Sequence, residues 1–297
     1  MIIHHRLNLS ADIAGPILDS LGLPFPANPP ANGRIVIPDV SESDPSWPRV
    51  ALLLDEYHRA WAAHPRNAFI VTRCGTTRDP LADIAHAKFS AAERRAAAHL
   101  ALDAAPLGFP QPQRLQEFYQ TTYKTACPHC RRGAEQIRSL CLSGEPKWAA
   151  SRGIFMLNWV DDEFLVKPEM YEKVFRPLGI SSRPVLDYKS QAALQTVVQL
   201  VIPLRADVDV ANAVYQTCGS CGGRSYDRDA RNYAPTPLSA PGPMFKSNQW
   251  FNPFHSIVYM TQELCRSIQA SGFRGAASIP VGRHNRIPPS PGGSGPC

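Results

Sequence analysis

An α+β fold is predicted by three features of this 297-residue sequence. Short apolar stretches with the alternation of half-buried strands recur along the whole chain. Helical spacing is confined to a few short segments between them. The chain also contains 29 prolines, which divide it into many short elements joined by long loops. We therefore expect an N-terminal α/β region followed by a mixed-sheet domain with few short helices.

The N-terminal α/β region is expected to cover residues 1–112. Strands are predicted at residues 2–8, 34–38 and 68–72, and a helix at 12–21. A stronger helix pattern begins near Pro48 and places five apolar side chains on one face, which we expect to be buried. Those side chains are Val50, Leu53, Leu54, Tyr57 and Trp61. The segment Ser90-Ala91-Ala92-Glu93 is typical of a capping box and predicts another helix that ends near residue 102.

The mixed-sheet domain is expected to cover residues 113–284, and the proline- and glycine-rich residues 285–297 are expected to form a disordered tail. Its predicted strands are residues 153–160, 194–204, 256–260 and 276–281, with the second ending at a sheet edge near Pro203. Its predicted helices are residues 134–140, a short helix that begins at Pro168, and residues 261–271, capped by Thr261 and ended by Gly272. Residues 222–249 are expected to form an irregular loop.

Two C-x-x-C pairs are the main chemical signal: Cys127-Pro128-His129-Cys130 and Cys218-Gly219-Ser220-Cys221, with 87 residues between them. Four thiolates form a closed tetrahedral zinc site that leaves no position for a catalytic water. In a chain of this length, which shows no secretion signal, such spacing favours metal over disulfides. The sequence therefore predicts one structural Zn²⁺ bound by Cys127, Cys130, Cys218 and Cys221.

The two pairs differ in the residues that follow them. Gly222 and Gly223 follow the second pair, and glycine there lets backbone N–H groups turn toward the sulfurs. Arg131 and Arg132 follow the first pair, where they would offset the negative charge of four thiolates. His129 lies between two ligands and is not expected to reach the same metal.

The other candidate residues are expected to be structural. Cys74, Cys141 and Cys265 are interpreted as small buried apolar residues, and His255 as a hydrogen-bonded histidine without a nucleophile beside it. The run Asp161-Asp162-Glu163 would suit a cation or acid–base chemistry, but after a strand it is interpreted as a solvated turn, with an interaction surface as the alternative.

Two further function classes stay open. The pair Cys127 and Cys130, followed by a helix, would also suit a thiol-disulfide oxidoreductase, whose first thiol lies at a helix N-terminus. The seven basic and three acidic residues of 227–297 would suit a zinc-ribbon nucleic-acid binder, although no long Lys/Arg run is present. No common hydrolase, phosphate-loop or metalloprotease motif is found, so a non-enzymatic role is favoured. The absence of a long apolar run or a secretory leader predicts a cytoplasmic location.

The chain contains, in order, a cysteine pair, a strand, a spacer and Cys-x-x-Cys-Gly, and then the segment Ile257-Val258-Tyr259-Met260-Thr261-Gln262-Glu263-Leu264. This order resembles that of the double-CXXCG-motif immunity proteins of bacterial swarm-inhibition toxin systems. The segments Glu145-Pro146-Lys147-Trp148 and Leu157-Asn158-Trp159-Val160 are similar to uncharacterised bacterial zinc-ribbon proteins. The resemblance covers residues 105–281, and the first pair departs from it because Arg131 replaces the glycine. It implies a non-enzymatic protein that binds and neutralises a cognate toxin.

Overall fold

The computed structural model describes ten parts of the chain, which form two compact units. The described residues are 2–26, 34–63, 83–106, 113–149, 151–157, 160–211, 213, 215–226, 234–251 and 255–281. Those up to Ser90 form unit 1, and those from Ala91 onward form unit 2. The predicted strand at 68–72 and the predicted tail lie outside the described residues.

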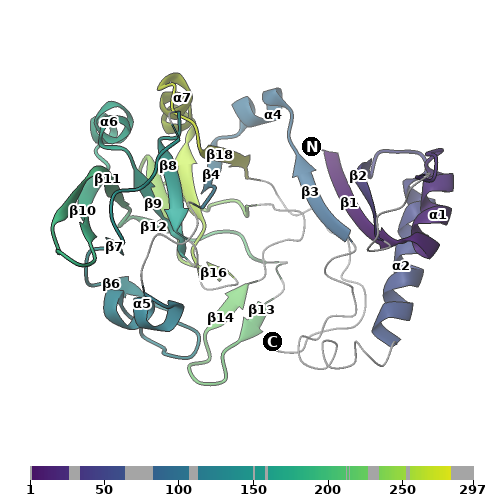
Figure 1. The fold of residues 1–297 in the computed structure, drawn as a ribbon, viewed down its shortest axis with the longest axis horizontal. Coiled ribbons are helices and arrows are strands. Elements are labelled where there is room, and N and C mark those ends of the chain that lie inside the picture. Colours follow the sequence, from purple (N-terminus) through teal and green to yellow (C-terminus); the bar gives the residue numbers. More distant parts are fainter. Residues whose placement is uncertain are drawn as a thin grey trace. The chain divides into compact units, whose positions relative to one another are not determined.

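Unit 1 is a small antiparallel sheet packed against two helices (Figure 1). Its strands, in the order β2-β1-β3, are β1 (Ile2–Ser10), β2 (Arg34–Ser41) and β3 (Asp83–Lys88). Its helices are α1 (Ala11–Ser20) and α2 (Trp47–Ala63). Alternate residues of β1, Leu7 and Leu9, are fully buried and pack with Val50 and Leu54 of α2. Two of the five predicted side chains of α2 are thus buried, while Leu53 and Tyr57 are partly buried against the same core and Trp61 is half-buried.

Unit 2 contains two five-stranded sheets. The first has the strand order β7-β10-β11-β9-β8, with β7 (Cys141–Leu142), β8 (Ile154–Leu157), β9 (Val160–Val166), β10 (Ser181–Asp187) and β11 (Ala193–Val201). The second has the order β12-β15-β17-β4-β18, with β4 (His99–Ala104), β12 (Arg205–Ala206), β15 (Met244–Ser247), β17 (Val258–Thr261) and β18 (Ala276–Pro280).

Strict alternation of side chains places the main core of unit 2 between these sheets. In β8, Ile154 and Met156 enter this core, whereas Phe155 enters a separate cluster on the opposite face. In β17, Met260 enters the shared core and Tyr259 enters a third cluster. Because both of its faces are covered, β8 is apolar and buried along its whole length rather than amphipathic.

Short helices cover the ends of the sheets. Helix α6 (Pro168–Met170) continues into a π-helical turn (Tyr171–Phe175) and a 3₁₀ turn (Arg176–Leu178), and this helical segment buries Met170, Val174 and Phe175. Helix α7 (Gln262–Ala270) is capped by Thr261, whose side-chain oxygen accepts a hydrogen bond from Leu264 N. At the other end of unit 2 lies α5 (Leu115–Thr122), as Figure 1 shows. Within the described ranges, no helix combines the length and apolar character needed to cross a membrane.

The structure confirms the α+β class and corrects five other predictions. The helix expected up to residue 102 is only α4 (Ala91–Ala96), because the following residues form β4 and pair with β17 and β18. That pairing also makes the chain divide after Ser90, not at the predicted residue 112. The strand β11 is central in its sheet rather than at an edge, and it ends before Pro203. Residues 134–140 form no helix, and the loop expected at 222–249 contains β15.

Candidate metal centre

The four predicted cysteine ligands lie in the loops of two β-hairpins. The first hairpin joins β5 (Tyr123–Lys124) to β6 (Glu135–Gln136), and the second joins β13 (Tyr215–Thr217) to β14 (Arg224–Tyr226). The loops close in the same way. Cys127 N donates to Arg132 O at 3.3 Å, and Cys218 N donates to Gly223 O at 2.9 Å. Each C-x-x-C pair therefore forms a tight turn that directs two sulfurs to one side.

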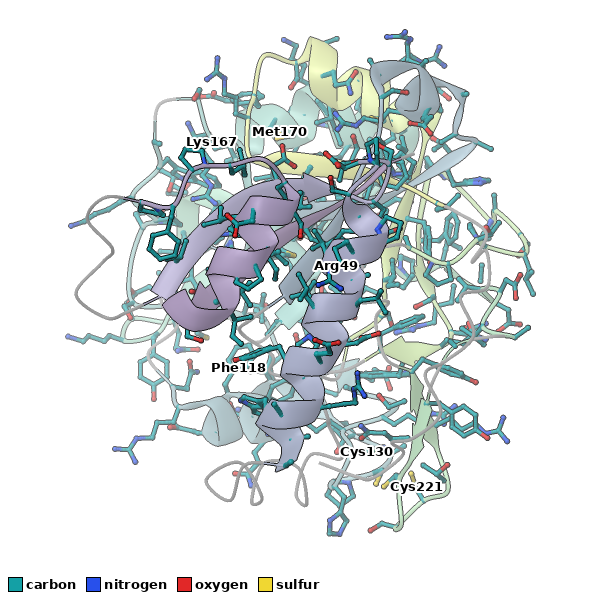
Figure 2. The ribbon with its side chains drawn as sticks, turned by 90° about the vertical axis from the view of Figure 1, so that its right-hand side faces the viewer. Arg49, Phe118, Cys130, Lys167, Met170 and Cys221 are labelled. Atoms are coloured by element: carbon teal, nitrogen blue, oxygen red, sulfur yellow. The ribbon has the colours of Figure 1, made fainter. Side chains whose placement is uncertain are left out.

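The two turns bring all four sulfurs together (Figure 2). Their Sγ atoms all lie within 4.8 Å of one another. Across the hairpins, Cys127 Sγ lies 3.9 Å from Cys218 Sγ, and Cys130 Sγ lies 3.6 Å from Cys221 Sγ. A tetrahedral zinc with bonds of ~2.3 Å would separate its sulfurs by ~3.8 Å. The chain thus forms a four-cysteine cluster of a size that fits zinc.

Backbone N–H groups around the sulfurs favour the thiolate form at two positions. The N–H of Cys130 lowers the pKa of Cys127, and the N–H groups of Ser220 and Cys221 lower the pKa of Cys218 to about 6. Burial has the opposite effect on Cys130 and raises its pKa to about 12. Four crowded thiols cannot all ionise without a compensating cation, and a divalent metal supplies that compensation.

The residues that directly follow the two cysteine pairs, Arg131 and Gly222, share the same backbone conformation. Gly222 has φ 68°, in the left-handed region that favours glycine, and Arg131 occupies the equivalent position with φ 53°. The Arg131 guanidinium stacks on Tyr119, with its Cζ 4.1 Å from the ring centroid. The neighbouring Arg132 side chain lies against Gly223, so closely that a β-carbon on Gly223 would be 2.6 Å from its Nη1. Arg132 therefore connects the two hairpins beside Cys221.

Replacing Arg131 separates the effects of the left-handed backbone and of stacking. We expect Arg131→Ala to lower the free energy of unfolding of the metal-loaded protein by ~0.5–1 kcal/mol, because the stacking is lost and the backbone cost stays. In Arg131→Gly the left-handed cost of ~1–2 kcal/mol is removed. This gain offsets two losses in the glycine variant. One is the lost stacking, and the other is the larger backbone entropy of glycine in the unfolded chain, which costs ~0.5–1 kcal/mol. Urea unfolding should therefore rank the glycine variant above the alanine variant, and the reverse order would contradict the backbone argument.

The remaining candidate residues stay outside the sulfur cluster. His129 is exposed and is not among the clustered ligands, as predicted. No helix follows Cys130, so the structure gives Cys127 no helix N-terminus of the kind that activates thioredoxin-like oxidants. Cys265 is buried, as expected, while Cys141 is half-buried, and the His255 side chain is buried. Cys74 lies outside the described residues.

The interpretation of the acidic run as a solvated turn was wrong for the two side chains that can be described. Residues 161–163 belong to β9, and Glu163 is only 8% exposed. Lys246 of β15 donates to Glu163 Oε1 at 2.7 Å and to Asp162 Oδ2 at 3.3 Å. Although burial disfavours the charge of Lys246, the two carboxylates outweigh it and raise the pKa of Lys246 above its usual value. This buried ion pair joins the two large sheets of unit 2.

Amide side chains extend the buried ion pair to the first cysteine hairpin. Gln199 of β11 is 1% exposed and donates to Glu163 Oε2 at 2.8 Å. It also exchanges hydrogen bonds of 2.6 and 3.0 Å with Gln136 of β6. Sequence reasoning missed Lys246, Gln199 and Gln136, since no local pattern distinguishes them from surface residues. The four residues Gln136, Gln199, Glu163 and Lys246 form a continuous polar chain, which we call the interior polar chain.

Tyr123, on the same hairpin, has a buried hydroxyl without a hydrogen-bond partner among the described residues. Burial, followed by the charges of Glu163 and Asp162, raises the pKa of Tyr123 well above the usual 10.0. A buried hydroxyl without a partner costs ~1–3 kcal/mol. We therefore expect Tyr123→Phe to leave the free energy of unfolding unchanged or to raise it by ~1 kcal/mol.

Tyr123→Phe should also make the protein more stable than the native protein at alkaline pH. Because the folded pKa is raised, the unfolded tyrosine ionises first, and the native state loses stability as the pH rises above 10.0. Tyr123→Phe removes this loss, so its advantage over the native protein should grow from pH 9 to about pH 11 in urea titrations. An advantage that stays constant over this range would show that Tyr123 ionises normally.

The fold and the sulfur cluster define the class of this protein as an α+β protein with four clustered cysteines that could hold a metal ion. Comparisons find no matching protein-family model and no significant relative among curated proteins. The four-cysteine geometry is therefore the principal guide to function.

Proposed function

We propose that the protein is a zinc-stabilised protein-interaction module that acts in the cytoplasm. The observation that carries this proposal is the convergence of four Sγ atoms within 4.8 Å, from two hairpins with the same loop closure. Zinc held by Cys127, Cys130, Cys218 and Cys221 would supply structural stability, since four thiolates leave no open coordination position. All six described cysteines are free, which agrees with a reducing compartment.

The second cysteine hairpin carries side chains suited to binding another protein. Tyr215 of β13 is 44% exposed, and the guanidinium of Arg224 lies over its ring, with Cζ 4.5 Å from the centroid. Tyr226 lies beside Tyr215, with 5.9 Å between the ring centroids. Tyrosine and arginine are enriched among the residues that dominate protein–protein binding energy. We therefore place the partner-binding surface on Tyr215 and Arg224.

We further propose that the partner is a cognate bacterial toxin and that the module is its immunity protein. The support is the resemblance of the cysteine pairs and the segment Ile257–Leu264 to double-CXXCG-motif immunity proteins, together with a closed metal site that leaves no catalytic position. In this function the metal fixes the hairpins so that Tyr215 and Arg224 are presented in one geometry. A rigid surface loses less entropy on binding.

Metal analysis tests the structural half of the proposal. Protein purified without added metal should contain one zinc per chain, and Cys218→Ser should contain none. The matched control is Cys141→Ser, a half-buried cysteine outside the cluster, which should keep the zinc. Native protein without zinc would refute the metal centre.

Growth rescue tests the immunity half. The protein should restore growth of cells that express a toxin encoded beside its own gene, and the double variant Tyr215→Ala/Arg224→Ala should lose this protection while keeping its zinc. Tyr188→Ala is the control, because Tyr188 is similarly exposed at 40% but lies outside the hairpin. If no neighbouring toxin is neutralised, the immunity function is refuted and the metal centre stands.

A further inference from the structure

A hollow between two helices of unit 2 has a strongly basic lining. It has a volume of about 380 Å³ and lies between α4 and α7. Three arginines line it: Arg94 and Arg95 from the last turn of α4, and Arg266 from α7. We call this feature the arginine hollow. Figure 1 shows both helices at the same end of unit 2, away from the cysteine hairpins.

Two uncharged residues of α7, Gln262 and Cys265, also line the arginine hollow. Gln262, in the first turn of α7, donates a side-chain hydrogen bond to Arg94 O and so connects the two helices. The floor contains Cys265, which is 4% exposed and accepts a hydrogen bond from Gln269 Nε2 at 3.4 Å. Burial raises the pKa of the Cys265 thiol, so the floor is uncharged at neutral pH. Among the described lining residues, the charge of the hollow therefore comes from the three arginines.

Among the residues that the structure describes, no acidic side chain lines the hollow. The acidic residues of the two helices, Glu93 and Glu263, are not part of the lining. In the part of the chain that the structure describes, the guanidinium groups of Arg94, Arg95 and Arg266 form no ion pair and no hydrogen bond with the protein. Three like charges around one concave site repel each other unless an anion lies between them.

We propose that the arginine hollow binds the linked phosphates of a small phosphorylated molecule. Guanidinium groups match phosphate oxygens with paired, charge-assisted hydrogen bonds, which lysine cannot reproduce. The volume of about 380 Å³ lies within the ~300–1,000 Å³ typical of small-ligand sites. Three arginines on two helices suit two or more linked phosphates better than a single carboxylate. Inorganic polyphosphate and a nucleotide share this chemistry.

Isothermal titration of the full-length, metal-loaded protein tests the site with two probes, sodium pyrophosphate and ATP. We expect binding with one-to-one stoichiometry that weakens as the salt concentration rises. Arg266→Gln and the double variant Arg94→Gln/Arg95→Gln should each weaken it at least ~10-fold, the effect of losing one hydrogen bond to a charged group. Tighter binding of ATP than of pyrophosphate indicates a nucleotide, and equal binding indicates a free polyphosphate.

Two controls separate the site from general charge and from folding. Arg49→Gln removes an exposed helical arginine from unit 1 and should leave the affinity unchanged. Arg266→Lys keeps the charge but loses the paired hydrogen bonds, so its affinity should fall while its melting temperature stays native.

Three results would overturn the proposal. The first is no binding of either probe, and the second is equal affinity of the native protein and the arginine variants. The third is binding of a single-stranded oligonucleotide alone, since that would identify a nucleic-acid surface in place of a small-ligand site. None of these results depends on the metal centre, so they leave the zinc and immunity proposals unaffected.

Discussion

Replacing Lys246 by methionine is expected to lower the free energy of unfolding by ~3–5 kcal/mol. Lys246 is 5% exposed and donates to both Glu163 and Asp162. Methionine fills a similar volume but leaves two buried carboxylates without a cation. Desolvated charges of this kind cost far more than the loss of a surface ion pair, which is worth ~0–1 kcal/mol. Urea unfolding at pH 7, followed by circular dichroism, measures the difference.

Two further variants show whether the loss of stability in Lys246→Met comes from the unpaired carboxylates. Lys147→Met changes an exposed lysine and should alter the free energy of unfolding by less than ~0.5 kcal/mol. Adding Glu163→Gln to Lys246→Met removes one of the two unpaired charges and should recover part of the loss. If Lys246→Met costs less than ~1 kcal/mol, the pair contributes no more than a surface ion pair and the argument fails.

Features encoded within a short segment could be predicted from the sequence. The spacing of Cys127 and Cys130, and of Cys218 and Cys221, needs only a tight turn, and both turns form as expected. Thr261 caps α7 because its side chain reaches an N–H three residues ahead. The strands β8 and β17 likewise form where the sequence predicts strands from short apolar runs.

Features that depend on distant partners could not be predicted. The alanine-rich residues after Ser90 favour a helix locally, yet β4 pairs with β17 and β18, and tertiary pairing overrides propensity. The sequence alone suggests a turn at the acidic run, because the cation that pairs with Glu163 is Lys246, 83 residues farther along the chain. Arg94 and Arg266 likewise line one hollow although they are far apart in the sequence. Single-sequence patterns contain no signal for such pairings.

The metal centre is expected to stabilise more than its own two loops. The strands of the cysteine hairpins are only two or three residues long, too short to persist without support. Gln136, in the first hairpin, also completes the hydrogen bonding of the buried Gln199 and thus of the interior polar chain. Release of the metal should therefore weaken both the hairpins and the buried polar contacts between the two large sheets.

Loss of the metal, by chelation or by Cys218→Ser, should lower the free energy of unfolding by several kcal/mol. Structural zinc binds with an apparent ~10–16 kcal/mol in zinc-finger peptides, and that binding energy stabilises the folded state. Hydrogen exchange should show lost protection in residues 123–136 and 215–226 first, with a smaller loss at Gln199. Cys141→Ser with zinc bound is the control and should behave like the native protein. If chelation removes the zinc and both the melting temperature and the exchange pattern stay native, the four cysteines do not stabilise this fold.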